Sequence, residues 1–183
     1  MMTKKKTKEL KVLGLDPSLS NWGVSRIRYS PSCIRVCSTE TFTTKETKGI
    51  AKNKSDLLRA KYLYNSIQED LDECDIVVIE LPYGSQSARA MASYGICLGL
   101  IASFKKPIIY VTPFDVKKVV GNKSATKKEI IDWVNTRHPN VLSKSLAKSE
   151  HQADATVAVY AAQQQLRNYY ENYFNCSGSE TDS

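Results

Sequence analysis

The alternation of apolar and polar positions predicts a chain that begins with strands and continues with alternating helices and strands. Two segments alternate with a period of two, as half-buried strands do, and a turn containing Pro31 separates them. Shorter runs are almost wholly apolar, which is typical of strands covered on both faces of a sheet. The predicted strands are residues 11–16, 22–29, 33–42, 75–80 and 107–111.

Apolar residues at helical spacing predict two helices between these strands. Residues 85–104 are apolar and rich in Gly, Ala and Ser, too short to span a bilayer, and are expected to form a buried helix. The other helix, residues 53–71, carries its apolar positions at Leu57, Leu58, Tyr62, Tyr64 (or Leu63) and Ile67.

Helix start signals predict three further helices in the second half of the chain. Thr112, followed by Pro113 and Asp115, has the signature of a capping box. Ser149, with Gln152 three residues later, predicts a second start of the same kind. The helices are predicted to end near Gly121, Arg137 and Tyr173, the middle one beginning after Ser124.

An antiparallel meander followed by alternating helices and strands predicts one α/β domain, a mixed five-stranded sheet flanked by helices on both faces. The domain is expected to span residues 11–174. A basic arm, residues 1–10, precedes it. A polar tail, residues 175–183, follows and is expected to be disordered.

Charge and cysteine usage narrow the class of protein. Lys and Arg number 26 against 19 Asp and Glu, a net charge of +7, which favours a polyanionic partner such as nucleic acid. Five cysteines without C-x-x-C spacing argue against a disulfide framework or a zinc site. The lysine-rich N-terminus lacks the apolar segment of a signal peptide. We therefore expect a cytoplasmic protein without membrane attachment. These features do not distinguish a bacterial, a phage and an organellar origin.

Four side chains are candidates for chemistry. Asp16 follows the apolar run 12–15, Glu80 follows the run 76–79, and His151 and Asp154 lie three apart on a predicted helix. Strand ends of this kind meet at one edge of a sheet, about 5 Å apart if the strands are neighbours. Carboxylates there are good ligands for hard divalent cations. Three carboxylates and an imidazole can hold two ions about 3.5–4 Å apart for in-line phosphoryl displacement.

Each candidate also has a plain structural interpretation. Asp16 can be a turn residue, and Glu80 can be half of a buried salt bridge. His151 can be a solvated residue of a first helical turn, where Asp154 would favour the helix dipole. The functional hypothesis therefore depends on all four meeting at one rim. His151 can then be a metal ligand or a proton-transfer group.

Five motifs occur in an order similar to that in RuvC, between Val12 and Ala162. They are Gly14-Leu15-Asp16-Pro17-Ser18, Ile79-Glu80, Val116-Lys117 with Val119-Val120-Gly121, Ser124-Ala125 with Lys127, and Gln152-Ala153-Asp154-Ala155. The chain thus resembles the RuvC-type Holliday junction resolvases of the ribonuclease H-like superfamily. The resemblance implies a homodimer that nicks two opposing strands of a four-way DNA junction symmetrically. It also implies two Mg²⁺ or Mn²⁺ ions per active site.

The resemblance assigns roles to particular residues. It implies catalytic metal ligands at Asp16, Glu80, His151 and Asp154, the third position being Asp in some members and His in others. Tyr83 matches an aromatic residue thought to stack on bases at the junction centre, although a packed loop tyrosine fits equally. Basic positions near the DNA are matched by Lys117 and Lys127; charge alone adds Arg89, Lys118, Lys123 and Lys128.

The helix over residues 85–104 resembles the dimer helix of that family. Its small residues allow close approach of a second backbone, although packing against the chain's own sheet would use them too. They are Ala92, Gly95, Gly99 and Ala102. Trp22, close to the first carboxylate, departs from the family pattern, and its role is open between packing and DNA contact.

Other functions remain to be weighed. A nuclease for flaps and forks would use the same site, and a catalytically silent junction-binding protein would have no use for clustered acids. The motif Gly14-Leu15-Asp16 with Ser18 and Gly23 is also similar to a phosphate-binding hairpin of actin-like kinases, but the chain is too short for their two lobes. The organism, the cleavage sequence, the range of branched substrates and any helper proteins are not specified by these patterns.

Overall fold

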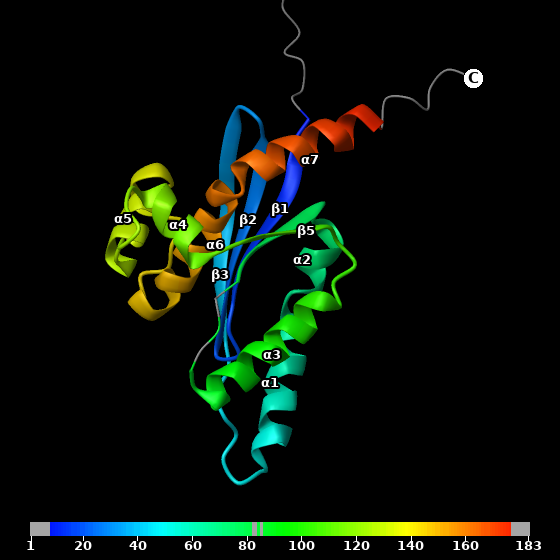
Figure 1. Cartoon of the computed structure of the whole chain (residues 1–183), viewed down its shortest axis with the longest axis vertical. Helices are drawn as coiled ribbons and strands as arrows, with labels where there is room; N and C mark the ends of the chain where they lie inside the picture. The colour runs from blue at the N-terminus through cyan, green and yellow to red at the C-terminus, as the bar shows by residue number, and fades with distance from the viewer. Residues whose placement is uncertain (1–7, 82–83, 85, 177–183) are drawn as a thin grey trace, which may run out of the picture.

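One mixed sheet of five strands forms the centre of the protein, in the order β3-β2-β1-β4-β5 (Figure 1). The computed structural model describes residues 8–81, 84 and 86–176. The central strand β1 is antiparallel to β2 and parallel to β4. The strands are β1 (Leu10–Pro17), β2 (Asn21–Ser30), β3 (Cys33–Thr43), β4 (Ile76–Glu80) and β5 (Ile108–Val111). The predicted five-stranded α/β sheet is confirmed.

Helices cover both faces of this sheet (Figure 1). The helices α1, α2 and α3 contribute to the core on one face, and α4, α5, α6 and α7 to the core on the other. Their bounds are α1 (Lys52–Ser66), α2 (Gln68–Glu73), α3 (Ala88–Ala102), α4 (Pro113–Val120), α5 (Lys127–Arg137), α6 (Leu146–Ala161) and α7 (Gln163–Cys176). Within the described ranges, no helix is long and apolar enough to cross a membrane.

The two cores are built from alternate positions of β1. Leu13 and Leu15 point to the core beneath α1, α2 and α3, whereas Val12 points to the core beneath α6. All three are at most 2% exposed, and burying each side chain contributes on the order of 2 kcal/mol. Gly14 shares the face of Val12, because side chains alternate along a strand. The residue at this position is glycine because the backbone of α6 occupies the space that a side chain would need.

The approach of α6 to the sheet depends on two strand glycines. A Cβ atom added to Gly14 would lie 2.3 Å from the carbonyl oxygen of Ala155. A Cβ atom added to Gly23 would lie 2.0 Å from the carbonyl oxygen of His151. Backbone atoms cannot move away as the end of a flexible side chain can. Glycine at both positions is therefore a steric requirement of the α6–sheet contact.

The predicted helix over residues 53–71 is two helices, α1 and α2, with a break at Ile67. Leu63 and Ile67 are buried, and so are the charged residues Asp56 and Arg59. Three side chains expected on its apolar face are largely exposed: Leu57 68%, Leu58 48% and Tyr62 51%. The spacing of the leucines was a misleading signal, because Asp56 and Arg59 satisfy each other's charge and replace apolar residues on the inward face.

The predicted start of the last helix was also wrong. α6 begins at Leu146 after Ser145, and Ser149 lies buried inside the helix, where its hydroxyl donates to the carbonyl oxygen of Leu146. Gln152 does not complete a capping box; its Oε1 accepts a hydrogen bond from the backbone N–H of Ser143 at 2.7 Å. The helix also ends at Ala161, and α7 follows as a separate helix. His151 and Asp154 consequently lie beyond the first turn, where the helix dipole offers Asp154 little.

Other start signals were correct. Thr112 and Asp115 form the expected reciprocal capping box of α4, and the helix ends at Gly121, whose φ of 124° favours glycine. Trp22 is fully buried and lies edge-on to Phe104, with 6.4 Å between ring centroids. Its role is packing in the core beneath α3. The expected arm (residues 1–10) and tail (residues 175–183) lie largely outside the described residues.

Replacing Gly14 by alanine should lower the free energy of unfolding by several kcal/mol, about 3 or more, because the new methyl group meets the backbone of α6. Gly49→Ala is the matched control. A Cβ atom there meets nothing within 4 Å, and its φ of 80° should cost only about 1 kcal/mol. Urea unfolding of both variants measures the difference, and equal costs would contradict the steric account.

Candidate active site

The sheet brings the first two carboxylates to one edge. β1 and β4 pair in parallel with Leu15 opposite Ile79, so Asp16 and Glu80 follow at the next positions of neighbouring strands. Adjacent strands are about 4.8 Å apart, so the two residues lie side by side at the carboxyl ends of these strands. The condition that their strands are neighbours is therefore met.

Helix α6 brings the other two side chains to the same edge. Because Gly23 pairs with Asp16 across β1 and β2 and admits the backbone of His151, the imidazole is held next to Asp16. The Nδ1–H of His151 donates to Oδ2 of Asp16 at 2.6 Å. Asp154 lies three residues further along α6, on the same side of the helix. The four candidates therefore come from three elements and meet at one rim.

Burial and mutual repulsion dominate the electrostatics of this rim. Glu80 is 9% exposed, and burial, followed by the charges of Asp16 and Asp154, raises its pKa to about 9. Burial and the charge of Asp16 also raise the pKa of Asp154 to about 7. The hydrogen bond to Asp16 raises the pKa of His151. The site resists accumulating negative charge unless a cation enters it.

The residues fit a divalent cation by their chemistry. Oε2 of Glu80 is buried and has no hydrogen-bond partner, which is costly for a carboxylate oxygen. The available donors are carboxylate oxygens and one imidazole, which suit hard cations such as Mg²⁺. In the described residues, however, no group of three or more His, Cys, Asp or Glu side chains is already arranged around a common point as metal ligands. The Asp16–His151 hydrogen bond takes up two of the candidate donors instead.

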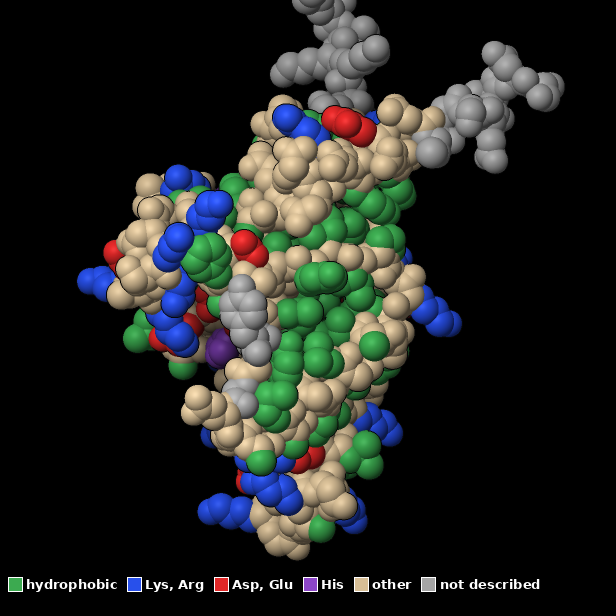
Figure 2. Space-filling model, in the orientation of Figure 1, with side chains coloured by type: hydrophobic (Ala, Val, Ile, Leu, Met, Phe, Trp, Pro, Cys, Tyr) green, Lys and Arg blue, Asp and Glu red, His purple; other side chains and the backbone are tan. Residues whose placement is uncertain are grey.

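A cavity of about 450 Å³ opens beside the carboxylates. Glu80 and Asp154 lie in its wall, together with Lys117 of α4 and Lys127 of α5. Figure 2 shows Lys and Arg side chains gathered over α4 and α5 on this side of the molecule. Nζ of Lys127 lies 2.5 Å from Oε2 of Glu150. The cavity therefore combines one buried and one half-buried carboxylate with two lysines in its wall.

The other predicted DNA-binding residues in the described part of the chain do not line this cavity. Lys118 and Lys123 are exposed, and Nζ of Lys123 lies 5.1 Å from the ring centroid of Phe114. Arg89 is on α3, where its guanidinium pairs with Asp56 at 2.5 Å. Tyr83 lies outside the described residues. Lys117 and Lys127 are thus the two predicted basic residues that line the cavity of the acids.

Sequence reasoning missed the residues that position the site. Gly23 appeared only in the kinase comparison, although a glycine inside a predicted strand is itself a signal of close backbone approach. Gln152 was predicted as a capping residue, but it is buried and its Oε1 also accepts from Thr39 Oγ1 at 3.2 Å. It joins α6 to β3. No local pattern indicates this bond, because Thr39 is 113 residues away.

The sheet order, the helices on both faces and the carboxylates at the ends of β1 and β4 define a ribonuclease H-like fold. No protein-family model and no curated protein sequence matches the chain. Solved structures do match it, and some of these contain Holliday junction DNA.

RuvC of T. thermophilus in complex with a Holliday junction substrate has a TM-score of 0.68 and 18% identity, covering 87% of this chain and 96% of that chain. Another T. thermophilus RuvC structure has a TM-score of 0.63 and 19% identity, covering 85% and 96%. The Fowlpox virus resolvase in complex with Holliday junction DNA has a TM-score of 0.56 and 12% identity, covering 86% and 99%. The chain therefore has the RuvC fold over most of its length.

The metal-free protein should become less stable as the pH rises from about 5 to 9. An unfolded glutamate releases its proton near pH 4.5, whereas folded Glu80 keeps its proton until about pH 9, so the folded state binds more protons in this window. Asp154, with a pKa of about 7, acts in the same direction. Below pH 4.5 Glu80 is protonated in both the folded and the unfolded state, so the loss of stability due to its ionisation disappears.

Thermal unfolding in chelator measures this dependence. Glu80→Gln should flatten the slope between pH 5 and 9, and Glu40→Gln, an exposed glutamate on β3, should leave it unchanged. Added Mg²⁺ should raise the melting temperature of the unmodified protein most at high pH. A pH slope that survives Glu80→Gln intact would contradict the assignment.

Proposed function

We propose that this protein is a divalent-metal-dependent endonuclease that resolves four-way DNA junctions by paired symmetric nicks. The observation that carries the proposal is the meeting of Asp16, Glu80, His151 and Asp154 beside a cavity with a basic wall. The RuvC fold supports it, because the T. thermophilus and Fowlpox virus proteins of that fold were solved with Holliday junction DNA.

Asp16, Glu80, His151 and Asp154 would hold the cations, Mg²⁺ or Mn²⁺, two in each site. When bound, such ions neutralise phosphate charge and activate a water for in-line displacement. The elevated pKa values of Glu80 and Asp154 support this role, because a bound cation would offset both the burial and the repulsion by neighbouring carboxylates that raise them. His151 would either give up its proton to become a ligand or keep it for transfer to the leaving oxygen.

The lysines of the cavity would bind the phosphates on either side of the scissile bond. Lys117 and Lys127 line the same cavity as Glu80, which supports this role. Lys118 and Lys123 extend the basic surface along the helix end and the loop after it. Tyr83 would stack on bases at the junction centre. Arg89 would have to leave Asp56 before it could contact DNA, which makes it the weakest member of this set.

A homodimer whose interface is formed by α3 would present two such sites to two DNA strands of one junction. Gly95 and Gly99 support this arrangement, because a Cβ atom added to either meets nothing within 4 Å. These glycines therefore do not serve packing against the chain's own sheet. Figure 2 shows a broad hydrophobic area that includes this side of α3. Exposed apolar surface of this kind is typical of protein interfaces.

Glu80→Gln should lower the rate of junction nicking by at least about 100-fold, because the amide removes a charge that holds the cations. Binding to the junction should persist, since the fold and the lysines are unchanged. Gel assays of nicking and binding with Mg²⁺, and with metal omitted, measure both effects. Glu40→Gln is the control. Full nicking by Glu80→Gln would disprove the metal assignment.

The same assay on a four-way junction, a fork, a flap and a plain duplex defines the substrate class. A resolvase should nick the four-way junction in two opposing strands and leave the duplex intact. Equal rates on forks and flaps would favour a broader branched-DNA nuclease. Binding to junctions without nicking in either cation would indicate a silent junction-binding protein.

Gly99→Arg should convert the dimer to a monomer. The new side chain has room in a single chain, but it places a charge in the centre of the α3 surface. Sedimentation should report twice 20.5 kDa for the unmodified protein and 20.5 kDa for the variant. Asn65→Arg, on an exposed position of α1, is the control. A monomeric unmodified protein would refute this arrangement.

A further inference from the structure

A second cavity, of about 370 Å³, lies between the β1–β2 turn and α3, on the face of the sheet opposite α6. It separates the turn between β1 and β2 from the N-terminal half of α3, and its size is in the range of small-ligand pockets. Its described lining residues are Pro17, Ser18, Leu19, Ser20, Gly84, Ala90, Ser93, Tyr94 and Cys97. Because Pro17 follows Asp16 directly and side chains alternate along a strand, the cavity begins one residue beyond Asp16, on the other face of the same sheet edge.

The lining of this pocket selects against phosphate. None of its described lining residues is charged, whereas the cavity of Glu80 and Asp154 contains two lysines. Tyr94 supplies an aromatic ring, and Leu19 and Cys97 supply apolar surface. Flat, uncharged groups that stack on an aromatic ring are what this surface fits, and DNA offers such a group in each base.

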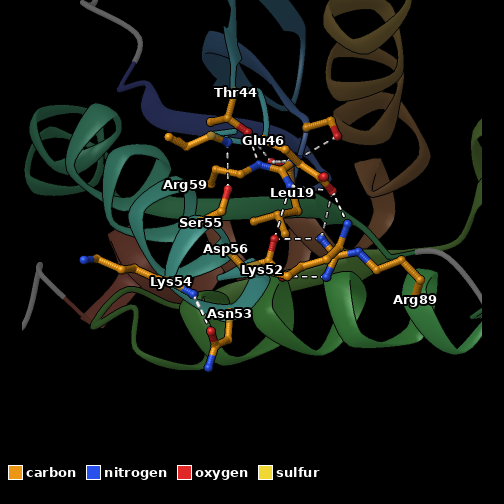
Figure 3. A network of polar contacts seen from close by, with 12 residues as sticks. Leu19, Thr44, Glu46, Lys52, Asn53, Lys54, Ser55, Asp56, Arg59 and Arg89 are labelled. Atoms are coloured by element: carbon orange, nitrogen blue, oxygen red, sulfur yellow. Dashed lines mark hydrogen bonds and ion pairs between the residues drawn. The ribbon is translucent and has the colours of Figure 1, made fainter. Parts of the chain in front are cut away.

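The wall of the pocket formed by the β1–β2 turn is held rigidly. Arg59 of α1 is buried, and its Nη2 donates to the carbonyl oxygen of Leu19 at 3.1 Å and to Ser20 Oγ at 3.0 Å (Figure 3). Its Nε donates to Thr44 Oγ1 at 2.9 Å. Asp56 pairs with this arginine at 3.3 Å. The charges of the network thus stabilise the turn without entering the pocket.

The opposite wall is fixed to the same network. Arg89, one residue before Ala90, donates from Nη2 to Asp56 at 2.7 Å (Figure 3). Both walls are therefore tied to Asp56, one through Arg59 and the other through Arg89. Hydroxyl groups of the turn are already engaged: Ser18 Oγ accepts from the N–H of Asn21 at 3.0 Å. Ser93 and Tyr94 are then the polar lining side chains of α3 that face a ligand.

We infer that this pocket receives one unstacked nucleobase from the nucleotide next to the scissile phosphate, and that it contributes to the cleavage sequence preference. The inference rests on the proposed nuclease function. A strand whose phosphate lies at the carboxylates places its neighbouring nucleotide one step away, beside Pro17. Tyr94 stacks on the base, and the Ser93 hydroxyl bonds to its edge. The basic cavity holds the phosphates, and the uncharged pocket holds the base.

Ser93→Phe fills the pocket and provides the first test. Nicking of an intact junction should fall about 10-fold or more, which corresponds to the loss of one stacked base. On junctions with one abasic nucleotide beside the scissile phosphate, tested on each side in turn, the variant should match the unmodified protein in one of the two positions. Ser38→Phe, on the exposed edge strand β3, should nick all substrates normally. An equal defect of Ser93→Phe on every substrate would overturn the inference.

A binding measurement separates this inference from the proposed function. The Glu80→Gln protein is mixed with junctions that carry 2-aminopurine at the flanking nucleotide, whose fluorescence reports unstacking and does not require nicking. The emission should change on binding, and adding Tyr94→Leu or Ser93→Phe should abolish the change. If the unmodified protein nicks junctions but these substitutions leave the emission unaltered, the pocket assignment fails while the nuclease stands. An emission change without any nicking would leave the pocket and remove the nuclease.

Discussion

The close contact of α6 with β1 and β2 is the constraint on which the site depends. Gly14 and Gly23 let the backbone of α6 reach the strands at Ala155 and His151, positions at which a methyl group would collide with carbonyl oxygens. The hydrogen bond from Thr156 to Ser25 at 2.9 Å and the bonds of Gln152 fix the helix in this position. If a larger side chain held α6 away from the sheet, His151 and Asp154 would be separated from Asp16 and Glu80.

That contact brings three carboxylates close together, and the protein compensates only part of their mutual repulsion. Glu80 and Asp154 lie close to Asp16 in a partly buried rim, and burial together with repulsion by the neighbouring carboxylates raises their pKa values. The Asp16–His151 hydrogen bond offsets part of it, while Oε2 of Glu80 remains without a partner. A buried carboxylate oxygen without a partner is costly, and a cation bound at this edge of the sheet would offset that cost, which is the physical basis of the proposed function.

The surroundings of the rim are divided by charge. Lysines lie on the side of α4 and α5, and an uncharged pocket lies on the side of α3. The network of Asp56, Arg59 and Arg89 lies behind the pocket and shapes it, which explains why α1 has charged residues on its inward face. Because this network occupies the inward face of α1, Leu57 and Leu58 are exposed, although the apolar periodicity predicted them to be buried.

Local patterns were sufficient for the strands, for the capping box of α4 and for the end of that helix at Gly121, because these features depend on residues close together in the chain. Asp16 and Glu80 could be recognised as candidates for the same reason, since each ends an apolar run. The start of α6, the break at Ile67 and the inward charges of α1 depend on partners far away, such as Thr39 for Gln152. Whether His151 reaches Asp16 was likewise settled by the packing of α6, because a contact across 135 residues has no local signature.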